Sequence, residues 1–339
     1  MSLKNINFYF VSLTGSVIFT YYYFLYTHEY PPGSSERIAN FEADKMFQTR
    51  MLVVSIANFA EPSLPFISDL LQWLIPYPVN YEVILQIINV IFTFLLVILF
   101  PTLLSCFGFR GSKLISLIVF VPLSWNYIFI NGLIDGAGLY YSFDIPSLTF
   151  FTVGLILFLK RKWLFFYPIF ILACLNRESA AFISLAGGMI TSNFTSIKFA
   201  VFCKNNPKIL LHVISQATIW ILLRIILSYL VKDNPGILFE KPQSMISFLN
   251  CIWTGSPHWA MQNPIWYFTL FAGIWVIPLL LYKYLDFQTR RLAIVGLIYV
   301  TLLCFRSNMM EIRVYNELNV IILVCMILSI KSKFQNKIV

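Results

Sequence analysis

The feature that most limits the fold of this chain is a series of apolar runs, each long enough to cross a lipid bilayer. A membrane-spanning helix needs about 20 mostly apolar residues, and such runs recur, for example from Ile6 to Tyr26 and from Val83 to Cys106. Charged residues make up only 12% of the sequence, whereas a soluble domain has about 25%. We therefore predict an all-α, polytopic transmembrane helical bundle, organised as a single integral-membrane domain over residues 1–339.

The spacing of these runs predicts about ten spans. Two long loops separate some of them, at residues 27–80 and 232–263. In the first loop, the stretch from Pro65 to Ile75 has apolar residues at helical spacing, which predicts an amphipathic helix lying in the membrane interface. The expected spans are residues 6–26, 83–106, 114–130, 145–159, two short halves on either side of Asn176-Arg177-Glu178, 209–231, 264–284, 292–305 and 318–330.

The distribution of positive charge predicts the orientation of the bundle. The net charge is +9, but most Lys and Arg residues lie in short loops between spans, as is typical of cytoplasmic loops. Membrane topology therefore explains the charge, and we expect no nucleic-acid partner. With ten spans, both termini are cytoplasmic and both long loops are extracytoplasmic. The first run has no small-residue cleavage site after it, which indicates a retained span rather than a signal peptide.

The acidic residues are distributed just as unevenly. Only Asp286 falls on the predicted cytoplasmic side. Acidic residues contribute little to membrane orientation, so topology alone does not account for this asymmetry. It favours an active site with carboxylates at the extracytoplasmic face.

Arg177 and Glu178 interrupt a nearly continuous apolar run from Trp163 to Ile190. Ionisable groups at membrane depth are costly, so they usually pair or line a wet cavity. The pair therefore indicates a functional site, with a structural ion pair or a tight loop as the alternative. Two short spans joined here would place the junction below the outer surface. One long kinked helix is the other interpretation, and it would move Lys198, Lys204 and Lys208 to the outer side, against the charge rule.

Four polar clusters fall on the same predicted side of the membrane. In the last of them, Arg313 and Glu317 are spaced to share one face of a helix. The clusters are Glu42, Asp44 and Arg50; Asp135 with Asp144; Asn176, Arg177 and Glu178; and Glu311, Arg313, Tyr315 and Glu317.

These residue types suit the transfer of a chemical group from a lipid-phosphate donor to an acceptor. Arginine binds phosphate through its planar fork, and a carboxylate can act as a general base or hold a divalent cation. His258, between Pro257 and Trp259, could line the site, although a loop histidine at the interface is the simpler interpretation. The scattered cysteines form no metal or disulfide pattern. A cofactor is not identified, and a divalent ion such as Mg²⁺ or Mn²⁺ stays open.

The arrangement resembles the GT-C superfamily of integral-membrane glycosyltransferases, in a poorly characterised bacterial branch. The pieces that carry the resemblance are Phe-Gln-Thr-Arg-Met-Leu, which begins at Phe47, Asn-Arg-Glu-Ser, which begins at Asn176, and Glu-Ile-Arg-Val-Tyr-Asn-Glu-Leu, which begins at Glu311. The resemblance implies a catalytic carboxylate in the first outer loop, matched here by Asp44 or Glu42, and a second acidic position, matched by Asp144. It also implies a polyprenyl-phosphate-linked sugar donor and a bacterial plasma membrane location.

We therefore expect an inverting hexosyl- or pentosyltransferase that acts on a lipid-linked glycan, glycolipid or cell-envelope polymer. The expected catalytic residues are Asp44, Glu42 and Asp144, although Asp144 could instead cap a helix. An O-antigen-type polysaccharide polymerase and a lipid-linked-glycan flippase or transporter are the alternative functions. The expected substrate and phosphate ligands are Arg50, Arg177, Glu178, Glu311, Arg313, Glu317 and His258.

Overall fold

The computed structural model describes residues 3–63, 81–134, 138–192, 206–237, 268–306 and 312–335. Six helical segments within these ranges are long and apolar enough to cross a membrane. They are α1 (Leu3–Tyr26), α6 (Tyr81–Cys106), the run of η3 (Lys113–Val119), α7 (Phe120–Leu123) and η4 (Ser124–Ile134), α12 (Pro207–Leu230), α16 (Phe287–Arg306) and α17 (Leu318–Gln335). The predicted helical architecture is therefore confirmed, and a multi-pass membrane protein is compatible with it.

Shorter helices complete the bundle. Three of them follow one another in the middle of the chain: α8 (Asp144–Leu159), α9 (Trp163–Asn176) and α10 (Ala181–Thr191). The later short elements are η5 (Glu178–Ala180), η7 (Leu270–Gly273), α15 (Val276–Leu280), η8 (Tyr282–Tyr284) and η9 (Ile312–Tyr315). Four of the expected spans fall on these shorter elements, so the count of about ten spans stays a prediction.

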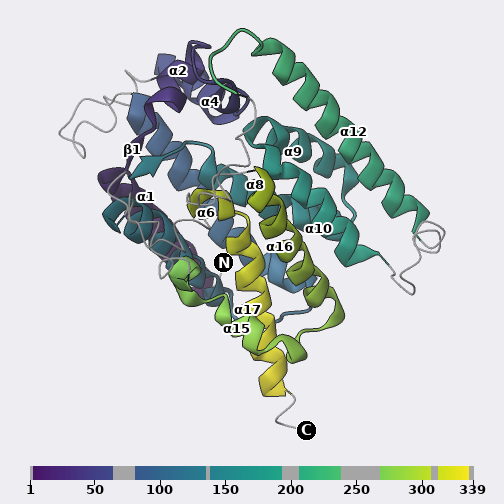
Figure 1. The fold of residues 1–339 in the computed structure, drawn as a ribbon. Helices are drawn as coiled ribbons and strands as arrows, with labels where there is room; N and C mark the ends of the chain where they lie inside the picture. The colour runs from purple at the N-terminus through teal and green to yellow at the C-terminus, as the bar shows by residue number, and fades with distance from the viewer. Residues whose placement is uncertain are drawn as a thin grey trace, which may run out of the picture.

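The first outer loop is folded rather than extended. It contains η1 (Pro31–Gly33), α2 (Ser35–Ala39), α3 (Lys45–Gln48), α4 (Leu52–Ala60) and η2 (Glu61–Ser63). A two-residue parallel pairing joins β1 (His28–Glu29) to β2 (Leu139–Tyr140), which precedes α8. We call residues 28–63 the cap, because α2 and α4 lie over one end of the bundle in Figure 1, opposite the end at which α17 terminates. The predicted interfacial helix at Pro65–Ile75 lies outside the described residues.

The cap has a small apolar core of its own. Ile38, Phe47 and Val54 from the cap pack with Tyr141 and Phe143, which lead into α8. The Ser35 amide and hydroxyl both donate to the Glu29 carboxylate, the amide at 3.0 Å. Burial raises the pKa of the Glu29 carboxyl above its ordinary value, and these hydrogen bonds oppose the shift. The cap is therefore packed on the bundle by apolar contacts, and polar contacts stabilise the cap itself.

Helix α8 is the central element of the bundle, and most of its residues are buried. Small residues allow its neighbours to approach closely, as is common between membrane helices. A Cβ at Gly187 of α10 would lie 2.4 Å from the ring of Phe158 in α8, and one at Gly154 of α8 would lie 2.7 Å from Ile183 in α10. In contrast, α12 lies along one flank of the bundle (Figure 1) and has few buried residues.

Helices α9 and α10 run in opposite directions. Lys160, just before α9, and Thr191, at the end of α10, line the same cavity at one end of the bundle. Arg177 between the helices has extended backbone (φ −159°, ψ 146°). With 14 and 11 residues, the helices are about 21 and 17 Å long at the usual rise per residue. The interpretation as two short halves is favoured, and the single kinked helix is wrong.

The helix expected at residues 264–284 is irregular where it is described. Phe271 and Ala272 have left-handed backbone, with φ of 58° and 55°. The Phe271 amide donates to the side-chain oxygen of Asn126 in η4, at 2.8 Å. This polar contact replaces a hydrogen bond within the helix and gives a physical reason for the break.

The basic residues gather at one end of the bundle. The Lys331 ammonium group, near the end of α17, donates to the Gly108 carbonyl at 2.8 Å, just beyond the end of α6. Lys160 and Arg161 lie at the same end. The cap, with its acidic residues, covers the opposite end. We therefore call these two ends of the bundle the basic end and the acidic end.

Arg161 occupies a position at which glycine is usual. It has φ +55°, while the Arg161 amide donates to Phe158 and the Lys162 amide donates to Leu157, both at 2.9 Å. This pair of hydrogen bonds closes α8 in a Schellman motif, whose left-handed residue is most often glycine. We expect Arg161→Gly to stabilise the fold by about 1 kcal/mol because it removes the strain of a left-handed side chain. The measurement is the midpoint of thermal unfolding in detergent micelles.

The control for this prediction is Gly108→Ala. Gly108 also has positive φ, at 75°, and a Cβ there would contact nothing within 4 Å. The alanine variant should lower the midpoint because of backbone strain alone. A midpoint for Arg161→Gly at or below that of the wild type would contradict the interpretation.

Candidate functional site

Arg177 and Asp144 form an ion pair in the interior of the bundle. The Arg177 Nη1 atom lies 3.1 Å from Asp144 Oδ1. The two residues are only 5% and 0% exposed. Asp144 is the first residue of α8 rather than its N-cap, which is Phe143, and a carboxylate in the first turn is favoured by the helix dipole. The predicted cap role of Asp144 is therefore wrong, and its carboxylate instead neutralises Arg177.

Arg50 and Glu178 form a second ion pair, which joins the cap to the bundle. Arg50 Nε donates to Glu178 Oε2 at 3.0 Å, and Nη2 donates to Oε1, so the contact is bidentate. The guanidinium also lies over the ring of Phe143, 4.8 Å from its centroid. The Arg50 side chain is 7% exposed and that of Glu178 is 37% exposed. Glu178 is therefore the open member of the pair.

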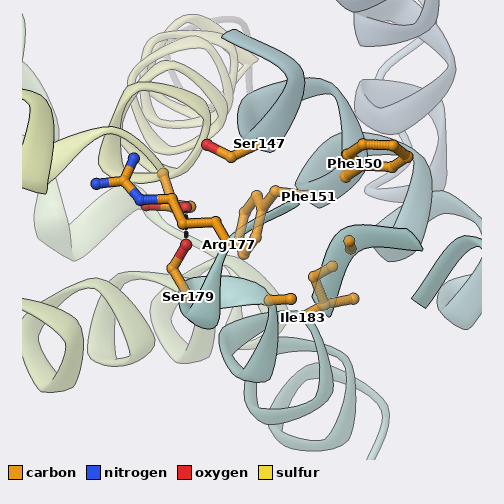
Figure 2. Close-up of a pocket in the computed structure, with 9 residues that line it drawn as sticks. Ser147, Phe150, Phe151, Arg177, Ser179 and Ile183 are labelled. Carbon is orange, nitrogen blue, oxygen red and sulfur yellow. Dashed lines mark hydrogen bonds between the residues drawn. The ribbon is translucent and has the colours of Figure 1, made fainter. Parts of the chain in front are cut away.

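The carboxylate of Glu317 is held by two hydroxyl groups. Ser179 donates to Oε1, and the Tyr299 hydroxyl lies within hydrogen-bonding distance of Oε2 and of the Val314 carbonyl. Figure 2 shows Ser179 and Arg177 on the polar side of a small cavity, with Phe151 and Ile183 on the apolar side. The volume of this cavity is about 10 Å³. A space of this size holds about one water molecule, so the cluster is tightly packed.

Asparagine side chains connect the charged groups to the surrounding helices. Asn316 donates to the Ser147 hydroxyl at 2.6 Å and also to the Asp144 carbonyl. The Asn316 side-chain oxygen accepts from Tyr127 in the π-helical segment η4. Asn176 donates to the Phe143 carbonyl at 2.9 Å. These contacts fix the start of α8, the end of α9 and the start of α17 relative to one another.

A third arginine approaches the cluster from α12. Arg224 donates to the carbonyl of Cys174 in the last turn of α9. In the same helix, the Trp220 indole donates to the carbonyl of Glu178 at 2.9 Å. Within the described residues, the cluster thus contains as many arginines (Arg50, Arg177 and Arg224) as carboxylates (Asp144, Glu178 and Glu317). Two arginines and two carboxylates are joined in ion pairs, as charges removed from water require, whereas Arg224 binds a carbonyl and Glu317 binds hydroxyl groups.

The predicted bases Asp44 and Glu42 lie in the cap and take part in no ion pair among the described residues. Glu42 is exposed, whereas Asp44 is partly buried at the start of α3. The segment that follows α12 packs against them, since Asn234 donates to the carbonyls of Phe41 and Ala43 at 2.8 and 2.9 Å. A Cβ at Gly236 would lie 3.0 Å from Asp44 Oδ2. The two long loops therefore meet at Asp44.

The structure does not describe the side chains of four residues from the predicted polar clusters and site. His258 and Glu311 lie outside the described residues, as does Asp135, and only the backbone of Arg313 is described, within η9. Of the other predicted residues, the structure brings together Arg50, Arg177, Glu178, Asp144 and Glu317. Among the described residues, no three His, Cys, Asp or Glu side chains are grouped so that they could hold a metal ion.

Sequence reasoning missed several residues of the cluster. Tyr299, Tyr127 and Ser147 each lie within otherwise apolar helices and bind a charged or amide side chain of the cluster. Asn126 and Asn319 belong to the same network, with 3.3 Å between their side chains. The signal that could have found them is a polar side chain in an apolar span, because a buried polar group is costly unless it is hydrogen-bonded.

We expect Asp144→Asn to destabilise the protein strongly. It leaves Arg177 buried without its carboxylate partner, and breaking a buried pair in this way costs about 3–5 kcal/mol. The free energy of unfolding can be compared by thermal denaturation in one detergent. The matched control is Asp233→Asn, an exposed carboxylate whose loss should change stability by less than about 0.5 kcal/mol. Equal stability of the two variants would show that Asp144 does not compensate Arg177.

Comparisons of the chain with protein-family models, with curated proteins and with solved structures find no match. The GT-C resemblance therefore stays a prediction that rests on short motifs in the sequence. Function is inferred below from the chemistry of the cluster and the cap.

Proposed function

We propose that this protein is an integral-membrane glycosyltransferase. It moves a sugar from a polyprenyl-phosphate-linked donor to a lipid-linked or cell-envelope glycan. The observation that carries the proposal is the position of the cap, which places two carboxylates, Glu42 and Asp44, at the acidic end of the bundle and is tied to the interior through the Arg50–Glu178 ion pair. A carboxylate near a rigidly held arginine suits the transfer of a sugar from a phosphate leaving group.

The acidic end faces the extracytoplasmic side in this proposal. Lys160, Arg161 and Lys331 gather at the opposite end, and an excess of Lys and Arg marks the cytoplasmic side. Ten crossings of the membrane would place both termini in the cytoplasm. Polyprenyl-phosphate sugars and growing envelope glycans are both lipid-anchored, so an active site at the membrane surface could receive both.

Asp44 is the proposed general base. Its carboxylate accepts the proton of the acceptor hydroxyl while that oxygen forms a bond to the anomeric carbon of the sugar. The bond from the anomeric carbon to the phosphate oxygen breaks, and polyprenyl phosphate leaves with the electron pair. Attack from the face opposite the leaving group inverts the anomeric configuration. The adjoining Asn234–Gly236 segment supports this role, because Asn234 binds the carbonyl of Ala43, the residue before Asp44, and Gly236 has no Cβ to crowd the carboxylate.

Arg50 is the proposed ligand of the donor phosphate. Its carboxylate partner Glu178 is 37% exposed, and a phosphate oxygen can replace a carboxylate oxygen on a planar guanidinium group. Arg177 lies deeper, bound to Asp144. In this proposal, Arg177, Asp144 and Glu317 position the turn that carries Glu178 and do not touch the donor.

The described cavity beside Arg177 has a volume of about 10 Å³. This volume, room for about one water molecule, gives no support to a transport path through the cluster. The flippase or transporter is therefore the less favoured alternative. The O-antigen-type polymerase is less favoured for a different reason, because the second long loop, residues 232–263, contains no arginine.

The assignment of the base predicts the outcome of one substitution. Asp44→Asn should lower the release of polyprenyl phosphate from synthetic polyprenyl-phosphate sugars by at least about 100-fold, because general base catalysis contributes this much or more. The assay uses purified protein in lipid with an added acceptor extract, and a thermal midpoint confirms that the variant is folded. Glu36→Gln is the matched control, since Glu36 is an exposed carboxylate of the cap and should keep full activity.

Other outcomes of this assay are equally informative. Loss of activity in Glu42→Gln, with Asp44→Asn fully active, would move the base to Glu42. Full activity in both variants would contradict a cap carboxylate as base. Binding of polyprenyl phosphate with no release from any donor would favour the polymerase or flippase.

The assignment of Arg50 predicts a different kinetic effect. Arg50→Lys keeps a positive charge beside Glu178 but removes the planar fork. We expect the donor KM to rise by about tenfold, which corresponds to about 1.4 kcal/mol of lost binding, with a smaller change in kcat. Lys45→Gln is the control, because Lys45 is also in the cap and should leave the donor KM unchanged. An unaltered KM in Arg50→Lys would remove Arg50 from the donor site.

A further inference from the structure

A second polar cavity lies at the basic end of the bundle, far from the proposed active site. Its volume is about 330 Å³, which is at the lower end of the range for ligand pockets. It is formed where α6, α8 and α10 end and where α16 begins. The residues that the argument uses are Ser105, Cys106, Lys160, Arg161, Thr191 and Gln288.

The lining of this cavity favours an anion. Lys160 and Arg161 supply two positive charges, and the amide of Gln288 can donate a hydrogen bond. No acidic side chain lines the cavity within the described part of the chain. The two cations are exposed, so they have no structural task of the kind that buried arginines perform in the charge cluster.

The backbone at Arg161 adds an independent argument. Its φ of +55° lies in the left-handed region, and the closing hydrogen bonds of α8 at Phe158 and Leu157 fix this conformation. A glycine would meet the same backbone requirement without strain. Backbone strain at a residue other than glycine favours a functional role for its side chain. The Arg161 side chain lines the cavity.

The position in the fold indicates the source of the anion. Helices α6 and α16 are apolar and long enough to span a bilayer, so their ends lie at the level of the lipid headgroups. Basic pockets between membrane helices on the cytoplasmic side bind anionic headgroups. We propose that this cavity binds the phosphate of an anionic phospholipid, with Lys160, Arg161 and Gln288 as its ligands. This site is separate from the proposed transferase site and rests only on the proposed orientation of the bundle, not on the transferase activity.

Cys106 provides a reporter inside the cavity. It is a free, partly buried cysteine that lines this space, whereas Cys304 is a partly buried cysteine in the later part of α16. The full-length protein is reconstituted in phosphatidylcholine vesicles with or without phosphatidylglycerol. The rate of alkylation by N-ethylmaleimide is then measured for each cysteine by peptide mass spectrometry.

The expected result is slower alkylation of Cys106 when phosphatidylglycerol is present, with Cys304 unchanged. At a lipid concentration of about twice Kd, the Cys106 rate should fall about threefold. Lys160→Gln/Arg161→Gly should abolish this protection. Lys162→Gln should keep it, because Lys162 is a neighbouring exposed cation that does not line the cavity. This control separates occupancy of the cavity from a general effect of vesicle charge.

A third arm adds inorganic phosphate to protein in phosphatidylcholine vesicles. No protection by phosphate alone is expected, since a lipid is already held in the bilayer beside the cavity and free phosphate is not. Equal protection by inorganic phosphate would overturn the lipid assignment and identify a free phosphate site. Wild-type protein without protection by phosphatidylglycerol, or protection that persists in Lys160→Gln/Arg161→Gly, would overturn the proposal entirely.

Discussion

The ion pair between Arg177 and Asp144 is the interaction on which the rest of this structure depends. Both side chains are removed from solvent, so loss of either one would leave the other as a buried charge without its ion-pair partner. The pair joins the first residue of α8 to the residue that directly follows α9. It also explains why the chain reverses at Arg177, since extended backbone there directs the guanidinium at the first turn of α8.

The second ion pair joins the cap to the bundle, because the buried Arg50 also needs a partner of opposite charge. Glu178 follows Arg177 directly, and its partner Arg50 comes from a loop that precedes it by 128 residues. The cap therefore cannot move away from the bundle without exposing Arg50 and leaving the turn at Glu178 incomplete. Packing of Phe47 against Tyr141 adds an apolar contact, with 5.6 Å between their ring centroids. These contacts give the carboxylates of the cap a fixed position, which a catalytic base requires.

The two ends of the bundle differ in how their positive charges are arranged. At the acidic end, Arg50 and Arg177 are buried and paired, while the carboxylates Glu42 and Asp44 of the cap take part in no ion pair among the described residues. At the basic end, Lys160 and Arg161 are exposed around an open cavity. A phosphate group would be held through Arg50 at the first end and by exposed cations at the second. In the two proposals, phosphate is thus bound at both ends of the bundle, for different purposes.

The sequence by itself determined the helical class of the protein, the polar interruption at Arg177 and Glu178, and the gathering of basic residues at one end. These features are local, because hydropathy and charge are properties of short segments. Only the tertiary structure decided that Arg50 pairs with Glu178 and that Asp144 neutralises Arg177 instead of capping α8. It also decided that hydroxyls hold Glu317. Partner choice among buried charges depends on which helices pack together, and residues that are 33 or 128 positions apart, as in these two ion pairs, leave no periodic signal of that contact.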